Sequence, residues 1–133
     1  MATTTATLTL SSADLSSQAL SITSTMTLNK AGTTEGLDQT TGLTKKVYAA
    51  AQTNATLISA GDYADDTHSR VYIKNPSSST SDYFSITYGA SNIVVGRLYG
   101  GDFMFFPWEG EQDIDITTTE TSMELEFMVI NQG

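Results

Sequence analysis

Residues 96–116 read GRLYGGDFMFFPWEGEQDIDI, and the interpretation of this stretch decides the fold. The stretch contains three of the five Phe, the only Trp and five of the fifteen acidic residues of the chain. It can be a binding site with aromatic walls and acidic rims, or the central core strand of a small β-domain with a turn on each side. We favour a core strand at 103–108, FMFFPW, because the flanking segments YGGD and EGEQ are typical of turns. On this interpretation the aromatic rings fill an interior and leave no cavity in which a reaction could run.

Outside this stretch the chain alternates apolar and polar side chains with a period of two. In DIDITT, Ile114 and Ile116 are expected to face inward, and Asp113 and Asp115 outward. The segments RVYIKNP, DYFSITYG and MELEFMVI repeat the pattern, and turns separate them. Such spacing is typical of an antiparallel sandwich or barrel. We therefore predict an all-β fold, an antiparallel β-sandwich of roughly eight strands that is either jelly-roll or immunoglobulin-like, because strand pattern does not reveal strand order.

Length and composition exclude several classes of function. A chain of 133 residues is expected to form a single β-sandwich domain over residues 1–133. It has no Cys for a disulfide or thiolate zinc site, and His68 is its only histidine, so no metal site of these kinds is expected. The net charge of −9 argues against nucleic acid as a partner. No stretch approaches the ~20 apolar residues of a membrane-spanning helix, and the N-terminus lacks the pattern of a secretory signal, so we expect no membrane partner.

The N-terminal third of the chain is polar and is predicted to make contacts between subunits. We expect residues 2–43 to form an extended arm followed by a long polar loop at 29–43, NKAGTTEGLDQTTGL. Segments of this composition bury little apolar surface, so the domain itself or a neighbouring chain must hold them. A Thr-rich strand suits strand addition to a neighbour, and we expect residues 2–12 and 29–43 to be the contact segments. The candidate interface residues are Thr5, Thr7, Thr9, Lys30, Thr33, Thr34, Leu37 and Trp108.

Four carboxylates follow the aromatic stretch at a spacing of two: Glu109, Glu111, Asp113 and Asp115. On a strand, Asp113 and Asp115 share one outer face. Carboxylate oxygens can bind Ca²⁺, and a pair of carboxylates can hydrolyse a glycosidic bond. The EF-hand spacing is absent, however, and so small a domain leaves little room for a substrate cleft. We therefore favour a solvated strand face, with no metal and no cofactor.

The segment DYADDTHSR places Asp62, Asp65, Asp66, His68 and Arg70 close together in the sequence. An Asp–His pair can serve in general acid–base catalysis or in a catalytic triad. No GxSxG elbow occurs to supply a placed nucleophile. We favour a polar turn whose Asp and Ser side chains cap free amides, and we predict no catalytic residue and no enzyme activity.

Four segments together resemble part of a known class of protein. They are RVYIKNP, DYFSITYG, VGRLYGGDFMFFPWEGEQDIDITT and MELEFMVI, within residues 68–130. In this order they resemble the C-terminal half of small virion structural proteins of tailed phages, most of all those of marine and cyanobacterial phages. ATLTLSSADLSSQALSI and KAGTTEGLDQTTGL near the N-terminus are similar to such proteins with less specificity.

This resemblance implies a structural component of a phage particle without catalytic residues. The expected role is that of a capsid decoration (cement) protein, which lies on the outer capsid surface of the virion and bridges subunits of the major capsid protein. Such proteins are often homo-oligomers, and a trimer would match local three-fold symmetry on a shell. A tail or fibre-associated structural protein is one alternative. A carbohydrate-binding module of the virion is another, and it requires an exposed Trp108 or Tyr72 to stack on sugars.

Overall fold

The computed structural model describes residues 3–37, 39–63 and 68–132, and its regular structure there is almost entirely β. The one helical element described is the 3₁₀ turn η1 (Ala60–Asp62), so no described helix has the length or apolar character to cross a membrane. All strand pairs are antiparallel. The strands are β1 (Thr4–Ser12), β2 (Leu20–Leu28), β3 (Gln39–Thr40), β4 (Thr44–Tyr48), β5 (Gln52–Ile58), β6 (Ser69–Lys74), β7 (Tyr83–Tyr88), β8 (Ile93–Tyr99), β9 (Phe103–Trp108), β10 (Ile114–Thr118) and β11 (Met123–Asn131).

The chain divides into two compact units, each of which is described by itself. Among the described residues, the first unit comprises residues 3–37 together with Gln132, and the second comprises residues 39–63 and 68–131. The sequence predicted one domain over residues 1–133, with residues 2–43 as its arm and loop. The division between the two units falls within that arm-and-loop segment.

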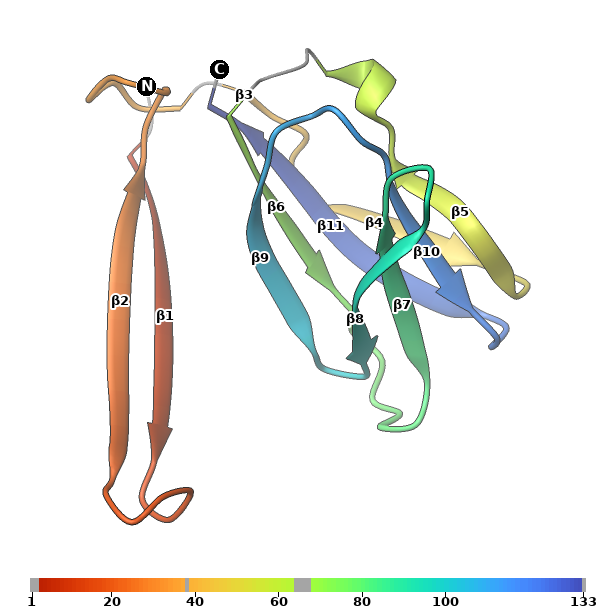
Figure 1. Cartoon of the computed structure of the whole chain (residues 1–133), viewed down its shortest axis with the longest axis horizontal. Helices are drawn as coiled ribbons and strands as arrows, with labels where there is room; N and C mark the ends of the chain where they lie inside the picture. The colour runs from red at the N-terminus through yellow and green to blue at the C-terminus, as the bar shows by residue number, and fades with distance from the viewer. Residues whose placement is uncertain (1–2, 38, 64–67, 133) are drawn as a thin grey trace. The chain divides into compact units, whose positions relative to one another are not determined.

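The first unit is built on a two-stranded hairpin of β1 and β2 (Figure 1). The strands pair without interruption from Thr4 opposite Leu28 to Ser12 opposite Leu20. Period-two patterning predicted strands in both segments, but it does not state which strand pairs with which. The N-terminal segment is therefore extended as expected, yet β2 already occupies one of its two backbone edges.

The second unit consists of two antiparallel sheets in a sandwich-like arrangement (Figure 1). One sheet has the order β5-β10-β7-β8. In the other, β9, β6 and β11 lie side by side, and β3 and β4 both pair with the remaining edge of β11. From β4 onward each strand is followed by one in the opposite sheet, except for the β7–β8 hairpin. The predicted all-β fold with antiparallel sheets is confirmed.

Inward-facing side chains from both sheets form one core in the second unit. The predicted alternations hold here, because the apolar positions of β6, β7 and β10 are buried between the sheets. β11 contributes its alternate residues in the same way. Burial of these side chains supplies the main stabilising term, at about 1.5–3 kcal/mol for each one. The fully buried apolar residues of this core are Val71, Ile73, Phe84, Ile86, Ile114, Ile116, Leu125 and Val129.

The aromatic strand β9 is an edge strand and not the central strand predicted for it. Among the described strands it pairs with β6 alone. Met104, Phe106 and Trp108 pack on the core, which confirms the predicted core role for one face of the strand. Pro107 explains the edge position, since it has no N–H to donate to a second neighbour and is therefore confined to sheet edges. On the other face of β9, Phe103 is 57% exposed and Phe105 is half-buried.

Candidate assembly surfaces

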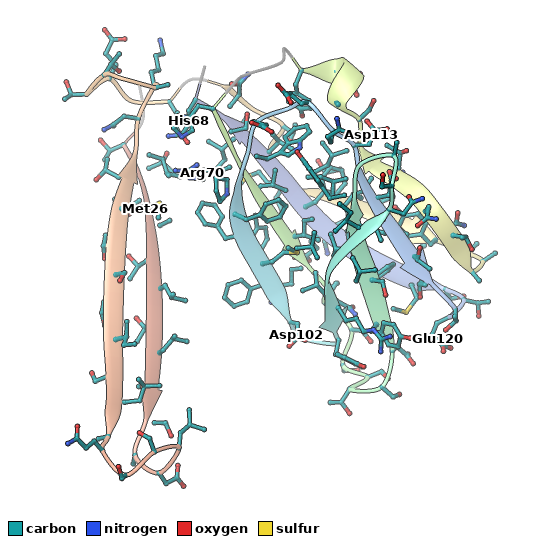
Figure 2. All side chains as sticks on the ribbon, viewed as in Figure 1. Met26, His68, Arg70, Asp102, Asp113 and Glu120 are labelled. Carbon is teal, nitrogen blue, oxygen red and sulfur yellow. The ribbon has the colours of Figure 1, made fainter. Side chains whose placement is uncertain are left out.

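The β1–β2 hairpin has one apolar face, and four of its large side chains are exposed. Leu10 lies opposite Ile22 and Ala6 opposite Met26, and Leu8 extends the same face. Figure 2 shows Met26 on β2. The four large side chains are between 43% and 46% exposed. We call Ala6, Leu8, Leu10, Ile22 and Met26 the apolar hairpin face. An isolated two-stranded hairpin is at best marginally stable in water, so a layer over this face would stabilise it considerably.

The opposite face of the hairpin consists of hydroxyl side chains. Thr5, Thr7 and Thr9 of β1 lie opposite Thr27, Thr25 and Thr23 of β2. The hydroxyls of Thr7 and Thr25 are 3.1 Å apart and hydrogen-bonded across the strands. The candidate interface residues Thr5, Thr7 and Thr9 are all exposed on this polar face. Their contact role stays a prediction, and the apolar signal on this hairpin lies on the other face.

The segment after the hairpin folds on itself, in contrast to the open loop predicted for residues 29–43. The backbones of Asn29 and Gly36 form a β-bridge, and the ammonium of Lys30 lies 3.7 Å from a carboxylate oxygen of Glu35. The Thr33 hydroxyl donates to the Lys30 carbonyl and accepts from the Glu35 amide. β3 lies within the same predicted loop. The predicted loop is therefore partly regular structure.

The remaining candidates in this region differ in exposure. Thr33 and Thr34 are exposed, and Lys30 is half-buried. Leu37 is buried within the chain. Gln132 anchors the start of the segment, because its side-chain amide donates to the Asn29 carbonyl at 2.8 Å. Thr33 and Thr34 are thus accessible to another chain, whereas the side chain of Leu37 is not.

Trp108, the last candidate interface residue, belongs to the core. Its ring is 4% exposed, and its indole Nε1 donates to the Gln112 carbonyl at 3.0 Å. The Tyr63 ring meets it edge-on, with ring centroids 5.1 Å apart. These contacts account for the burial of Trp108, whose contact role stays a prediction.

A second uncovered apolar region lies along the edge strand β8. Ile93, Val94 and Val95 are consecutive and between 57% and 63% exposed. Val95 is the extra residue where the pairing register with β7 shifts between Ile86 and Thr87. Within the described part of the chain β8 pairs with β7 alone. An exposed apolar edge strand is a ready template for association, and proteins normally protect such an edge.

An open hollow of about 470 Å³ adjoins this edge. Its lining is mostly apolar and comes from the end of β7, from β8 and from β9. Ile93 pairs opposite the lining residue Tyr88 and so shares its face, whereas Val94 pairs opposite Thr87 on the other face of the sheet. We call the hollow together with Ile93 the β8–β9 groove. The residues that line the hollow are His68, Tyr88, Val95, Phe106, Pro107, Trp108 and Glu109.

The β8–β9 groove corrects the expectation that the aromatic stretch leaves no cavity. Phe106 and Trp108 each present one side to the hollow while packing on the core with the rest of the ring. The hollow's ionisable lining residues are His68, Tyr88 and Glu109. Burial raises the pKa of Tyr88, and the carboxylates of Glu109 and Glu111 raise it further, so this phenol stays protonated at neutral pH. The groove thus offers an apolar contact surface with one acid and one imidazole among its lining residues.

The carboxylates after Trp108 are not a uniform solvated face. Asp113 accepts a hydrogen bond of 2.7 Å from the Ala60 amide, which ties η1 to the start of β10. Asp115 is only 8% exposed, so the expectation that it points to solvent is wrong. Its Oδ1 is buried and has no protein partner among the described residues. With Glu111 and Gln112, both aspartates line a smaller hollow of about 250 Å³.

No group of three or more His, Asp and Glu side chains in residues 3–37, 39–63 and 68–132 is placed to hold a metal ion. Figure 2 shows Asp102 and Glu120 at one end of the second unit and Asp113 at the other, so these acids are not gathered in one site. In the predicted polar turn, Asp62 belongs to η1 and His68 is exposed, whereas Asp65 and Asp66 lie outside the described residues.

Comparisons of this chain with protein-family models, with curated proteins and with solved structures find no match. The proposals below therefore rest on the sequence resemblance and on the geometry of the chain.

Proposed function

We propose that this protein is a structural component of a phage particle, a capsid decoration or cement protein on the outer surface of the shell. In this role it bridges subunits of the major capsid protein and acts as a homo-oligomer, such as a trimer. It has no catalytic task. The observation that carries the proposal is the apolar hairpin face, because an uncovered apolar layer on a small acidic protein serves association with other chains.

Strand order supports a finer proposal, that the second unit is a jelly roll. When β4–β11 are counted as eight strands, one sheet has the order first, eighth, third, sixth, and the other second, seventh, fourth, fifth. This winding, with crossings between sheets at nearly every step, supports the jelly-roll proposal. An immunoglobulin-like sandwich keeps more of its sequence neighbours within one sheet. Jelly rolls are common in viral capsid proteins and also in lectins.

Charge is compatible with a place on the outside of a shell. The net charge of −9 repels packaged DNA and keeps unassembled copies soluble. The polar loops and the two uncovered apolar regions supply the mixed surface that spreads a contact over several subunits.

Binding to shells tests the proposal directly. Purified protein is mixed with expanded capsid shells that lack it, and bound protein is measured by co-sedimentation, with unexpanded shells as the control. We expect saturable binding to expanded shells and a higher temperature of shell disruption. Absence of binding, together with unchanged particle stability when the protein is missing, would contradict the cement role.

Location in the particle separates this role from the tail alternative. Labelled protein should be distributed over the whole shell for a decoration protein, and restricted to one vertex for a tail or fibre component. The carbohydrate-binding alternative required an exposed Trp108 or Tyr72. Trp108 is buried and Tyr72 is half-buried, so the exposure of these two rings does not favour a carbohydrate-binding module.

A further inference from the structure

We propose that the apolar hairpin face of one copy docks on the β8–β9 groove of a second copy, so that copies of this chain join by exchanging their hairpins. The inference goes beyond the particle role. It concerns how copies associate with one another, and it holds whether or not they bind a capsid.

The hairpin has the properties of an exchanged element. Its apolar face alternates strictly with its hydroxyl face over the full length of both strands. Neither strand contains a charged residue, and Asp14, in the turn between them, is the one charge within residues 3–28. An uncharged hairpin can approach an acidic partner without like-charge repulsion, whereas two acidic bodies repel each other. This difference in charge favours contact of hairpin with body over contact of body with body.

The β8–β9 groove has the properties of the receiving surface. It is open and mostly apolar, and Ile93 and Val95 of β8 contribute exposed β-branched side chains to it. The unpaired edge of β8 also offers backbone groups to an incoming strand, as in strand addition. A two-stranded layer with apolar side chains at alternate positions can supply both the pairing edge and the apolar side chains that this surface accepts.

The exposed area is sufficient for a pair of copies that exchange hairpins reciprocally. From the exposed fractions, the large side chains of the apolar hairpin face with Ile93 and Val95 present roughly 500 Å² in one hairpin–groove contact. A reciprocal pair makes this contact twice and buries roughly 1,000 Å², which meets the lower bound for a specific interface. Such a pair has two-fold symmetry, because each copy gives its hairpin to the other.

Cysteine cross-linking tests the arrangement, since the chain has no Cys of its own. Copies with Ile22→Cys are mixed with isotopically labelled copies with Ile93→Cys, unfolded and refolded together, oxidised and analysed by mass. We expect mixed dimers of one labelled and one unlabelled chain. The matched control replaces Ile93→Cys by Val47→Cys, at an exposed valine on β4, and should give several-fold less mixed product.

Two cross-linking outcomes would overturn the proposal. One is cross-linking of Ile22→Cys copies to one another with no mixed product. The other is efficient cross-linking within a monomeric chain that carries both cysteines, because the hairpin would then cover its own body.

Association in solution gives an independent measurement. Replacing Leu10→Thr and Ile22→Thr removes apolar surface and leaves a β-branched residue at both positions, so the hairpin should still form while association weakens by roughly tenfold or more. The control carries Thr9→Ser and Thr23→Ser at the adjacent pair on the hydroxyl face and should associate like the parent. Sedimentation over a range of concentrations distinguishes them, and a parent protein that is monomeric at every concentration contradicts the proposal.

Discussion

Tyr48 ends β4 in the core of the second unit, with a hydroxyl that costs stability. The side chain is 5% exposed, and its ring lies 5.9 Å from that of Phe84. The hydroxyl is buried and has no hydrogen-bond partner among the described residues. A buried hydroxyl without a partner loses its hydrogen bonds to water, and no hydrogen bond within the protein replaces them. Packing of the ring therefore outweighs a polar penalty at this position.

Replacing Tyr48→Phe should stabilise the protein by about 1 kcal/mol, because the change removes the unpartnered hydroxyl and leaves the ring in place. The free energy of unfolding at neutral pH, from urea titration, measures the effect. Tyr83→Phe, at a half-buried tyrosine on β7, serves as the control and should change stability by less. A clear loss of stability on Tyr48→Phe would mean that the hydroxyl has a partner in solution.

The same residue predicts how stability depends on alkaline pH. Burial raises the pKa of Tyr48 from 10.0 to about 12. Above pH 10 the unfolded chain loses this proton while the folded chain keeps it, so the free energy of unfolding falls between pH 10 and pH 12, by about 1 kcal/mol for each pH unit. Below pH 10 both states are protonated and this contribution is constant. The difference between the parent and Tyr48→Phe, measured by urea titration across this window, should grow with pH. A constant difference would contradict the prediction.

At the scale of elements, the turn between β8 and β9 depends on Gly100. A Cβ at this position would clash with the Ser79 carbonyl oxygen and lie 2.6 Å from that of Ser77. Both are backbone atoms and cannot move aside cheaply. Gly100→Ala should therefore destabilise the protein by about 2 kcal/mol or more.

Gly96 on β8 supplies the matched control, because a Cβ there meets nothing within 4 Å. Gly96→Ala should be within about 0.5 kcal/mol of the parent or slightly more stable, since Gly weakens a strand interior. Thermal unfolding of the two variants side by side provides the measurement. Equal stability would show that residues 77–79 do not approach Gly100 so closely in solution.

Elements could be predicted from the sequence better than their neighbours could. Period-two patterning identified the strands around Val71, Ile86 and Ile116, because a strand with one buried face has apolar side chains at every second residue. The pattern of side chains does not indicate which strands pair with each other, so the pairing of β1 with β2 was not predicted. One usable signal was overlooked, since Pro107 within the aromatic strand indicated an edge position. Asp115 was expected to be solvated because the alternation of apolar and polar residues predicts which face of the sheet a side chain lies on. It does not predict how far neighbouring residues bury that face.

For the molecule as a whole, the candidate surfaces were harder to foresee than the fold. The Thr-rich composition of residues 4–12 drew attention to the hydroxyl face of the hairpin. Leu8 and Leu10 share the other face with Ile22 and Met26, but this follows only when the pairing of β1 with β2 is known. The β8–β9 groove likewise combines two edge strands from different sheets. Surfaces assembled from distant segments require the topology before they can be recognised.

The central claim is that this protein works by assembly, through a hairpin whose apolar face is covered by another copy. Hydrogen exchange of the β1 and β2 amides tests it most directly, with the Leu10→Thr, Ile22→Thr variant as the comparison. An uncovered two-stranded hairpin opens readily and exchanges fast. We predict slow exchange of these amides in the concentrated parent protein and fast exchange in the variant, with the amides of β6 and β10 equally protected in both. Fast exchange of the hairpin amides in the parent and the variant alike would contradict the account.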